Sequence, residues 1–348
     1  MSMVSVAFVI SGRLDKGGGM DTIDIVLIGL GKMGAIHYNA LSRLANGEFE
    51  TYYKGGVENY LRKIRIAGVC DPDPARRIDA DVPFYADHRE LLAAHPPFIA
   101  VIAAPTREHV AITRDCLNAG AHAFVEKPLA PTVRDAIALQ QLAFAKGRRL
   151  LSGHVERFNP VSVAVRDAVA DGKLGKPLRY SFTRVQPHAD RIPDDVITDK
   201  LIHDVDLALN FFGRIDGFRV IDSRKKNGVV HEIKVELIHT SGAVGTVFTS
   251  WLVDEKIREC EIAFERGALR ADFVTKEYFI DGQKRVDFNP SITRGDNNAI
   301  KDELVDFIAI CVGLMDGESR VQPIITLDEV ITALQVVELA RQWTPEPR

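Results

Sequence analysis

The chain has 348 residues, of which 46% are hydrophobic, so it is long enough for two domains and shows no bias towards disorder. Its formal charge of -4, with lysines and arginines scattered along the chain, argues against a nucleic-acid or anionic-membrane partner and favours a small-molecule substrate. The four cysteines form no CxxC or Cys/His cluster, so we expect neither a disulfide framework nor a metal site. No apolar run is long enough to span a bilayer, and we expect a cytoplasmic protein.

Residues 1–19 differ from the sequence that follows them. The run DKGGGM separates them from DTIDIVLIGLGKMG, which already begins a complete strand and turn. A Lys-Gly-Gly run before a methionine can be encoded by a purine-rich ribosome-binding site. We therefore hypothesise that translation begins at Met20 and that residues 1–19 are an extension outside the native protein, which mass spectrometry of the native N-terminus would test.

From Ile23 to about Gly153, short apolar runs alternate with amphipathic stretches, which is typical of a doubly wound α/β domain with a parallel sheet. A GxGxxG motif follows the first apolar run and precedes a helical pattern, which is the context that a dinucleotide-binding turn requires. Its glycines permit a tight turn, close approach of the backbone to a pyrophosphate, and packing of helix on strand. We predict a Rossmann domain over residues 20–153 that binds the cofactor through Gly29, Gly31, Lys32, Met33 and Gly34.

The second apolar run ends at Asp71. A carboxylate at this position can accept hydrogen bonds from the adenosine ribose hydroxyls and repel a 2'-phosphate, so we expect NAD to be the cofactor rather than NADP. Alternatively, Asp71 and Asp73 only cap the turn that contains Pro74. The neighbouring Arg76 and Arg77 leave NADP open as a second cofactor.

The stretch VITDKLIHDVDLALNFFG, residues 196–213, has the periodicity of a packed helix but carries a polar stripe. Asp199, His203, Asp206 and Asn210 fall within about 60° of helical arc. A carboxylate four residues before a histidine can orient its ring or stabilise its protonated form. We expect Asp206 and Asn210 to fix the helix by hydrogen bonds.

Four motifs together carry a family resemblance. They are the GxGxxG turn and the stretches AAPTREHVAITRDCLNAGAHAFVEKPLA, LSGHVERFNP and DVITDKLIHDVDLALNFFG. In this combination the chain resembles the glucose-fructose oxidoreductase, inositol dehydrogenase and rhizopine-catabolism (Gfo/Idh/MocA) family. The likeness is strong from Ile23 to Gly213 and extends to the last third only as a pattern of strands and helices.

The resemblance implies an NAD(P)-dependent oxidoreductase whose catalytic residues are Lys127, Asp199 and His203. His203 would remove the hydroxyl proton of a secondary alcohol while Lys127 hydrogen-bonds the same oxygen, which suits their ordinary pKa values. From the residues alone, Lys127 could instead lie on the surface and His203 in the core, and burial could exchange their roles. The resemblance further implies cofactor contacts from Pro105, Thr106, His109, Glu126 and Lys127, although His109 could equally be a solvated residue.

The stretch GHVERFNP follows the last strand of the first domain, so we expect His154, Arg157 and Asn159 to enter a cleft and bind substrate. Arg191 is a further candidate for contact with a sugar or phosphate. A salt bridge between Glu156 and Arg157 at a helix start is the alternative.

Residues 154–348 contain a series of long apolar-polar strands after Lys176, which predict an α+β domain with a large, mainly antiparallel, open sheet. We assign substrate binding and oligomerisation to this domain. In VGTVFTSWL, apolar side chains point to both sides, so we expect helices on one face and a second subunit on the other, giving a homodimer or homotetramer. Helices over Ala299–Leu314 and Leu327–Trp343 would close this domain or pack on the first.

Within the family, the motifs look most like those of members that oxidise the 3-hydroxyl of UDP-N-acetylglucosamine ahead of an aminotransferase. Asp194, Thr198 and Lys200 depart from that pattern, because less polar residues are expected there. An inositol or free-sugar dehydrogenase is the alternative substrate class. A regulator that binds dinucleotide without turnover is the alternative of another kind.

Overall fold

The computed structural model describes residues 22–48, 63–188, 195–285, 298–313 and 324–343. The hypothesised extension over residues 1–19 lies outside the described residues, and so do Arg191 and Asp194.

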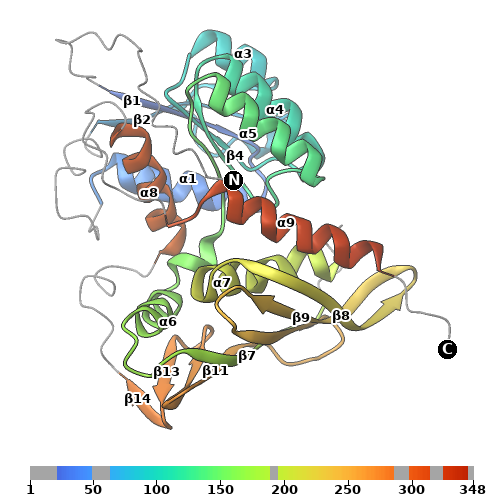
Figure 1. Cartoon of the computed structure of the whole chain (residues 1–348). Coiled ribbons are helices and arrows are strands. Elements are labelled where there is room, and N and C mark those ends of the chain that lie inside the picture. The colour runs from blue at the N-terminus through green and yellow to red at the C-terminus, as the bar shows by residue number, and fades with distance from the viewer. Residues whose placement is uncertain (1–21, 49–62, 189–194, 286–297, 314–323, 344–348) are drawn as a thin grey trace, which may run out of the picture.

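A six-stranded parallel sheet forms the N-terminal half of the chain (Figure 1). Its strand order is β3-β2-β1-β4-β5-β6. The chain order reverses between β1 and β4, and ligands of such sheets bind beyond the carboxyl ends of the strands at this point. The strands are β1 (Ile23–Ile28), β2 (Ile64–Cys70), β3 (Phe84–Tyr85), β4 (Ile99–Ile102), β5 (His122–Val125) and β6 (Leu150–Ser152).

Helices cover both faces of this sheet, so every residue of β4 and β5 is buried. Figure 1 shows α3 (His88–Ala94), α4 (Thr106–Asn118) and α5 (Val133–Ala145) on one face, and α1 (Lys32–Ala45) on the other. Beside α1 lies α8 (Ala299–Gly313), which comes from the C-terminal third of the chain.

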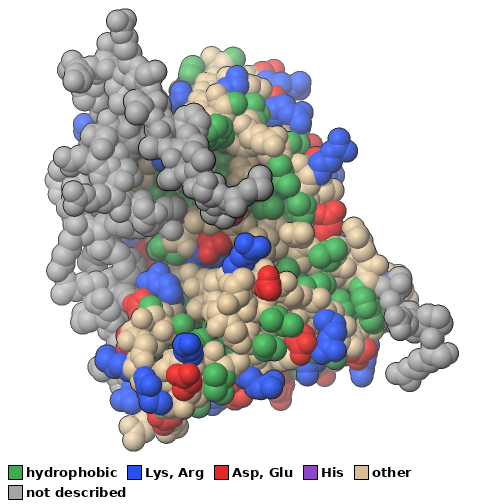
Figure 2. Space-filling model, in the orientation of Figure 1, with side chains coloured by type: hydrophobic (Ala, Val, Ile, Leu, Met, Phe, Trp, Pro, Cys, Tyr) green, Lys and Arg blue, Asp and Glu red, His purple; other side chains and the backbone are tan. Residues whose placement is uncertain are grey.

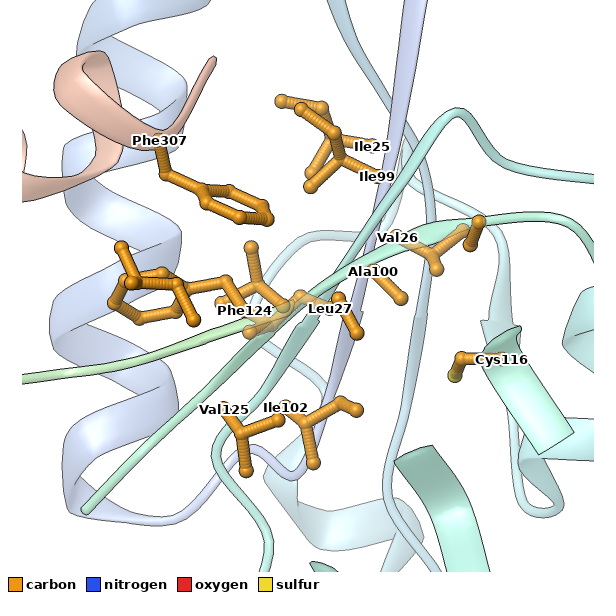
Figure 3. Close-up of a cluster of buried hydrophobic side chains, with 14 of the residues drawn as sticks. Ile25, Val26, Leu27, Ile99, Ala100, Ile102, Cys116, Phe124, Val125 and Phe307 are labelled. Atoms are coloured by element: carbon orange, nitrogen blue, oxygen red, sulfur yellow. The ribbon is translucent and has the colours of Figure 1, made fainter. Parts of the chain in front are cut away.

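Helix α8 completes the core of the first sheet. Its Phe307 is buried, with its ring 5.6 Å from that of Phe124 on β5 (Figure 3). Residues 23–153 therefore do not supply the whole hydrophobic core of their sheet. Helix α8, from the C-terminal third of the chain, supplies part of it.

An eight-stranded sheet forms the second half, in the order β14-β13-β12-β11-β7-β10-β9-β8. All neighbours pair antiparallel except β7 and β10, which are parallel. The strands are β7 (Pro177–Val185), β8 (Ile215–Lys226), β9 (Val229–His239), β10 (Val244–Ser250), β11 (Ile257–Phe264), β12 (Gly267–Asp272), β13 (Glu277–Ile280) and β14 (Gln283–Arg285). The predicted fold class, a Rossmann sheet followed by an α+β unit with a mainly antiparallel sheet, is confirmed.

Three helices lie on one face of the second sheet: α6 (Pro160–Ala170), α7 (Ile202–Phe212) and α9 (Leu327–Gln342) (Figure 1). On β10, Val247 is fully buried beneath them, whereas the next residue, Phe248, faces the other side and is half-buried. Among the described residues, no helix covers that other face.

Helix α9 joins the two halves. It begins with a capping box in which Thr326 and Glu329 satisfy each other's backbone N–H groups. Val330 and Leu334 pack into the first core, while Ala333 and Val337 pack into the second. None of the helices in the described ranges is long and apolar enough to cross a membrane.

Candidate active site

The glycine motif forms a tight turn between β1 and α1. Gly29 has a φ of +93°, and a Cβ there would lie 2.6 Å from the Ala104 nitrogen. A Cβ on Gly34 would lie 1.9 Å from the Gly29 oxygen, so helix and strand can approach only because both residues are glycine. At Gly31 the nearest atom to such a Cβ is Arg76 Nη1, at 3.8 Å. Open space therefore lies over the second glycine and over the first turn of α1, which fits a dinucleotide diphosphate.

Asp71 lies at the carboxyl end of β2 and holds this turn in place. Its carboxylate accepts hydrogen bonds from the Leu30 nitrogen at 2.8 Å and the Asp73 nitrogen at 3.0 Å. Arg76 Nη1 lies 3.4 Å from the same carboxylate, with half of its own side chain exposed. The turn-capping role of Asp71 is thus observed, and Arg76 occupies the position from which it would act on a 2'-phosphate.

Lys127 follows β5, and the peptide bond between Lys127 and Pro128 is cis. The preceding Glu126 is buried and accepts a hydrogen bond from His37 Nε2 of α1 at 2.6 Å. Burial would raise the pKa of Glu126, but the hydrogen bond from His37 together with the charges of His37 and Lys127 outweighs it and lowers that pKa. Glu126 therefore ties the Lys127 loop to the helix that starts at the glycine turn.

His109 is buried one turn into α4, so it is not a solvated surface residue. Its Nδ1 lies 2.8 Å from the Pro128 oxygen and its Nε2 lies 2.8 Å from the Ala104 oxygen. Burial lowers the pKa of His109, so the ring is neutral and can donate to one of these carbonyls at a time. The side chain links the loops after β4 and β5, beside Pro105 and Thr106, where α4 begins.

The chain enters α7 through a π-helical turn, Ile197–Leu201. This turn brings Asp199 to Lys127, whose Nζ lies 3.1 Å from the Asp199 oxygen and 3.4 Å from Oδ1. The other carboxylate oxygen, Oδ2, lies 3.1 Å from Lys200 Nζ. The four-residue spacing from Asp199 to His203 gives no hydrogen bond to His203 Nδ1, which has no partner among the described residues. Asp199 pairs with the two lysines instead.

His203 lies on the first turn of α7 with a half-buried side chain. Burial lowers the pKa of His203 well below its ordinary value, and the positive charges of Lys127 and Arg184 lower it further. Its Nδ1 has no hydrogen-bond partner among the described residues. The ring is therefore neutral near pH 7, and one of its two nitrogens carries a lone pair, which is the state that a general base needs.

Arg157 does not reach a cleft, which corrects the predicted substrate contact. Its side chain is 1% exposed and bonds Asp206 through two nitrogens, with Nη2 2.7 Å from Oδ1. Its Nη1 donates to the Ile324 oxygen at 2.8 Å and to Glu329 at 3.1 Å. The alternative pair with Glu156 is also wrong. All donors of the guanidinium are used inside the protein because α7 and α9 both supply acceptors.

His154 and Asn159 likewise serve the fold. His154 is 1% exposed, its backbone N–H donates to Glu303 of α8, and its Nδ1 lies 3.4 Å from Asp206. Asn159 caps α6 by accepting from the Val161 nitrogen at 3.1 Å. Neither side chain has a polar group directed at an open cleft, so both predicted substrate contacts are corrected to structural roles.

The prediction that Asp206 fixes the helix is confirmed by its ion pair with Arg157, whereas Asn210 Nδ2 has no partner among the described residues. Burial would raise the pKa of Asp206, but the charge of Arg157 prevails and lowers that pKa to about 2.

Three charged residues near His203 escaped the sequence reasoning, and Glu156 pairs with two of them rather than with Arg157. Arg184 on β7 bonds Asp204 at 2.8 Å and Glu156 at 3.0 Å, and Arg258 on β11 bonds Glu156 at 3.1 Å. The alternation of β7 places Arg184 on the buried side with Tyr180 and Phe182, which is the signal that could have revealed it.

The parallel sheet, the glycine turn and the approach of Asp199 to Lys127 are the arrangement expected of a dinucleotide-dependent oxidoreductase. Comparison with known families agrees. Residues 23–154 match the oxidoreductase family with an NAD-binding Rossmann fold, GFO_IDH_MocA, and residues 162–270 match the GFO/IDH/MocA C-terminal domain. The chain belongs to the Gfo/Idh/MocA family, as its motifs predicted, and NAD is its cofactor.

Curated relatives include two substrate types. Inositol 2-dehydrogenase 1 of Saccharopolyspora erythraea is 29% identical over 54% of this chain, and the match spans about half the length of that relative, at 53%. UDP-N-acetylglucosamine 3-dehydrogenase of Acidithiobacillus ferrooxidans is 27% identical over 73% of this chain and 75% of its own. The solved structure of GnnA, also a UDP-N-acetylglucosamine 3-dehydrogenase of A. ferrooxidans, superimposes with a TM-score of 0.74 at 22% identity, over 92% of this chain and 97% of that one.

Proposed function

We propose that the protein is an NAD-dependent dehydrogenase that oxidises a secondary hydroxyl of a sugar or polyol. The observation that carries this proposal is the meeting of Lys127, from the end of β5, with Asp199 and the neutral His203 of the second half. The three residues lie on the carboxyl side of the parallel sheet, where open α/β sheets bind their ligands.

In this proposal, bound NAD would supply the hydride acceptor for the substrate carbon. The neutral ring of His203 accepts the hydroxyl proton. Lys127 donates a hydrogen bond to the same oxygen, and Asp199 holds the ammonium group in place through its backbone and side-chain oxygens. Because the His203 ring is neutral and Lys127 Nζ already donates to Asp199, we assign the base to His203 and the hydrogen-bond donor to Lys127.

We propose that the diphosphate of NAD binds over Gly29, Gly31 and Gly34 with the first turn of α1, Lys32 and Met33, and that Asp71 faces the adenosine ribose. Pro105, Thr106 and Glu126 would line the nicotinamide end, with His109 fixing the two loops between them. We keep the division into a cofactor domain over residues 20–153 and a substrate and oligomerisation domain over residues 154–348, and propose a homodimer or homotetramer through the uncovered sheet face.

For the substrate, we propose a nucleotide sugar, with UDP-N-acetylglucosamine as the first compound to test and an aminotransferase as a partner that consumes the product. The support is the relative from A. ferrooxidans, which aligns over three quarters of its length. Myo-inositol is the second candidate, because inositol dehydrogenases are also relatives, although they align over about half their length. The buried positions of His154 and Arg157 remove two contacts that had favoured the nucleotide sugar.

The test is turnover by the purified protein with NAD. Each of UDP-N-acetylglucosamine, myo-inositol and glucose is incubated separately, with a keto-acid or aminotransferase acceptor present because alcohol oxidation by NAD is uphill near neutral pH. NADH absorbance and product mass are followed together. Loss of two hydrogen atoms from the nucleotide sugar alone supports the proposal, and turnover of inositol alone moves the protein to the second candidate. NAD binding without any turnover would indicate the non-catalytic regulator.

A further inference from the structure

A buried histidine of helix α1 has no part in the chemistry proposed above. His37 lies in the second turn of that helix, is 0% exposed, and makes an edge contact with the ring of Phe124 on β5 at 5.6 Å. Burying an imidazole among apolar groups costs free energy unless a hydrogen bond compensates it. The ring therefore needs a polar partner inside the protein.

That partner is Glu126, the residue directly before Lys127. His37 Nε2 lies 2.6 Å from Glu126 Oε1, and only 11% of the Glu126 side chain is exposed. Although burial raises the pKa of Glu126, His37 and Lys127 lower it overall, so the group is a carboxylate near pH 7. Because a carboxylate can only accept hydrogen bonds, Nε2 of His37 carries the hydrogen and donates it.

Glu126 extends this contact to the backbone of Lys127. Its second oxygen, Oε2, accepts from the Lys127 backbone nitrogen at 3.1 Å. At the end of the same residue, Lys127 Nζ donates to the Asp199 carbonyl oxygen at 3.1 Å. A continuous series of contacts therefore runs from α1, through His37 and Glu126, to the ammonium group of Lys127 and the turn before α7.

Stability alone is a weak reason for this buried pair. Apolar residues of similar volume often replace a buried ion pair without loss of stability, whereas a retained pair can fix one geometry. Glu126 is also held from the end of β6, because a Cβ on Gly153 would lie 3.5 Å from the Glu126 carboxyl carbon. Both oxygens of Glu126 have partners, so the carboxylate has one defined place between α1 and the Lys127 backbone.

We propose that His37 is a positioning residue for Lys127. Through Glu126 it holds the backbone of Lys127 at a fixed place relative to α1, the helix proposed to bind the NAD diphosphate, and so directs the ammonium group at the reacting hydroxyl. His37 itself has no exposed surface with which to touch substrate or cofactor. The inference rests on the proposed function, in which Lys127 hydrogen-bonds the substrate oxygen.

Substitutions at His37 test whether its N–H group is what matters. His37→Leu removes the donor and keeps an apolar side chain, whereas His37→Gln keeps an N–H group at about the reach of Nε2. Turnover is measured with NAD and whichever of UDP-N-acetylglucosamine, myo-inositol and glucose the parent protein oxidises. We expect His37→Leu to lower kcat by about 10-fold or more and to change KM less, because a small displacement of a positioned group slows the chemical step. His37→Gln should retain most of kcat.

A double-mutant cycle separates positioning of Lys127 from a general structural role. The Lys127→Ala variant has no ammonium group to position, so adding His37→Leu to it should leave the remaining kcat unchanged within about 2-fold. Equal losses in the two backgrounds would overturn the proposal. If His37→Leu does not fold, His37→Asn takes its place in the cycle, because its amide is too short to reach Glu126.

The matched control is His122→Leu. His122 is also buried and lies at the other end of β5, where its Nδ1 accepts from the Arg149 nitrogen at 2.8 Å. It has no contact with Glu126 or Lys127 among the hydrogen bonds of the described residues, so His122→Leu should leave kcat unchanged.

A measurement without turnover tests the position of Lys127 directly. The full chain is treated with acetic anhydride in the presence of NADH, and acetylation is followed by peptide mass spectrometry, with the 85% exposed Lys173 as internal reference. We expect Lys127 to react about 10-fold faster in His37→Leu than in the parent protein or in His122→Leu, which is the scale of one lost hydrogen bond to a charged group.

The outcomes separate the positioning role from the proposed function. Faster acetylation of Lys127 in His37→Leu, without turnover of any of the three compounds by the parent protein, would support the positioning role and contradict the dehydrogenase. Turnover by the parent protein with an unchanged kcat in His37→Leu would overturn the positioning role and leave the dehydrogenase in place. Absence of turnover together with unchanged acetylation of Lys127 would overturn both.

Discussion

Helix α7 and the turn before it carry two aspartates of one polar stripe in opposite environments. Asp199 has a 17% exposed side chain and pairs with Lys127 and Lys200, whose side chains are also partly exposed. Asp206, two turns further, is 1% exposed and is bonded through both oxygens by the buried Arg157. The helical spacing places both aspartates on one face and does not predict this difference in burial and in partners.

The difference arises from what each end of the helix faces. The beginning of the stripe lies against the Lys127 loop of the first half, which remains partly open to solvent. Its continuation lies against the GHVERFNP segment and the start of α9, which seal Arg157 on all sides. A polar stripe on an apolar helix can therefore combine a reactive end with a structural end.

The largest expected effect is the loss of stability when Asp206, at the structural end of the stripe, is removed. Asp206→Ala leaves the Arg157 guanidinium buried and without its main partner, which costs about 3–5 kcal/mol of unfolding free energy. Asp199→Ala should cost less, because the side chains of Asp199 and its two lysines are partly exposed and water can replace part of the lost pairing. Urea unfolding of both variants measures the contrast, and equal losses would show that the two ends do not differ in this way.

Stability at acidic pH tests the same ion pair, between Asp206 and Arg157. The pKa of Asp206 is lowered to about 2 in the folded protein, so its contribution to stability is present above the ordinary aspartate pKa of about 4. That contribution is lost as the pH falls towards 2. Asp206→Ala should therefore lie closest in stability to the parent protein at the acidic end of the range.

The second effect concerns the reactive end. Lys127→Ala and His203→Ala should each lower turnover by about 100-fold or more, the usual scale for a positioned proton-transfer group, while NAD binding stays nearly intact. Kinetics and cofactor titration on the same preparations separate chemistry from binding. Full turnover in either variant would remove that residue from the proposed chemistry.

Local patterns predicted the parts of this molecule that depend on neighbours in sequence. The strand, glycine turn and helix around Gly29 follow from residues that adjoin one another, and the mainly antiparallel second sheet follows from alternation along each strand. The role of Arg157 could not be predicted, because its partner Asp206 is 49 positions away and its partner Glu329 is 172 positions away. From the sequence alone, an arginine that is buried in ion pairs cannot be distinguished from an arginine that binds a ligand.

The predicted link between Asp199 and His203 failed for a related reason. The spacing put Asp199 and His203 on one helix face, but in the structure Asp199 pairs with Lys127 and Lys200. Lys127 lies 72 positions before Asp199, in the other half of the chain. Sequence placed these groups in one site through the family resemblance, and the structure shows which of them pair.

A third effect is a pH limit on turnover. Burial and nearby cations lower the pKa of His203, so the ring stays neutral below its ordinary pKa of about 6.5, and activity should fall only when the pH drops through the lower value. Lys200→Met removes one of these cations and should move the acidic limb of kcat/KM upward. A limb at the pKa of free histidine in the parent protein would contradict the assignment of His203 as base.

The smallest expected effect concerns the carboxylate of Asp71, which adds a third environment to the comparison of Asp199 with Asp206. Asp71 accepts hydrogen bonds from two backbone N–H groups and has one half-exposed cation, Arg76, at 3.4 Å. Its charge would repel a 2'-phosphate at close range, so Asp71→Ala should narrow the preference for NAD over NADP by about 10-fold, or about 1.4 kcal/mol.

Two controls separate the charge of Asp71 from its role in the turn. Asp71→Asn removes the charge and keeps a carbonyl acceptor for the Leu30 nitrogen, so it should narrow the preference with less loss of NAD affinity than Asp71→Ala. Arg76→Ala should instead weaken NADP binding, because the side chain closest to Gly31 is a cation that a 2'-phosphate could pair with. Titration of each variant with both cofactors measures the ratio. Tighter binding of NADP than of NAD by the parent protein would show that Arg76 prevails over Asp71.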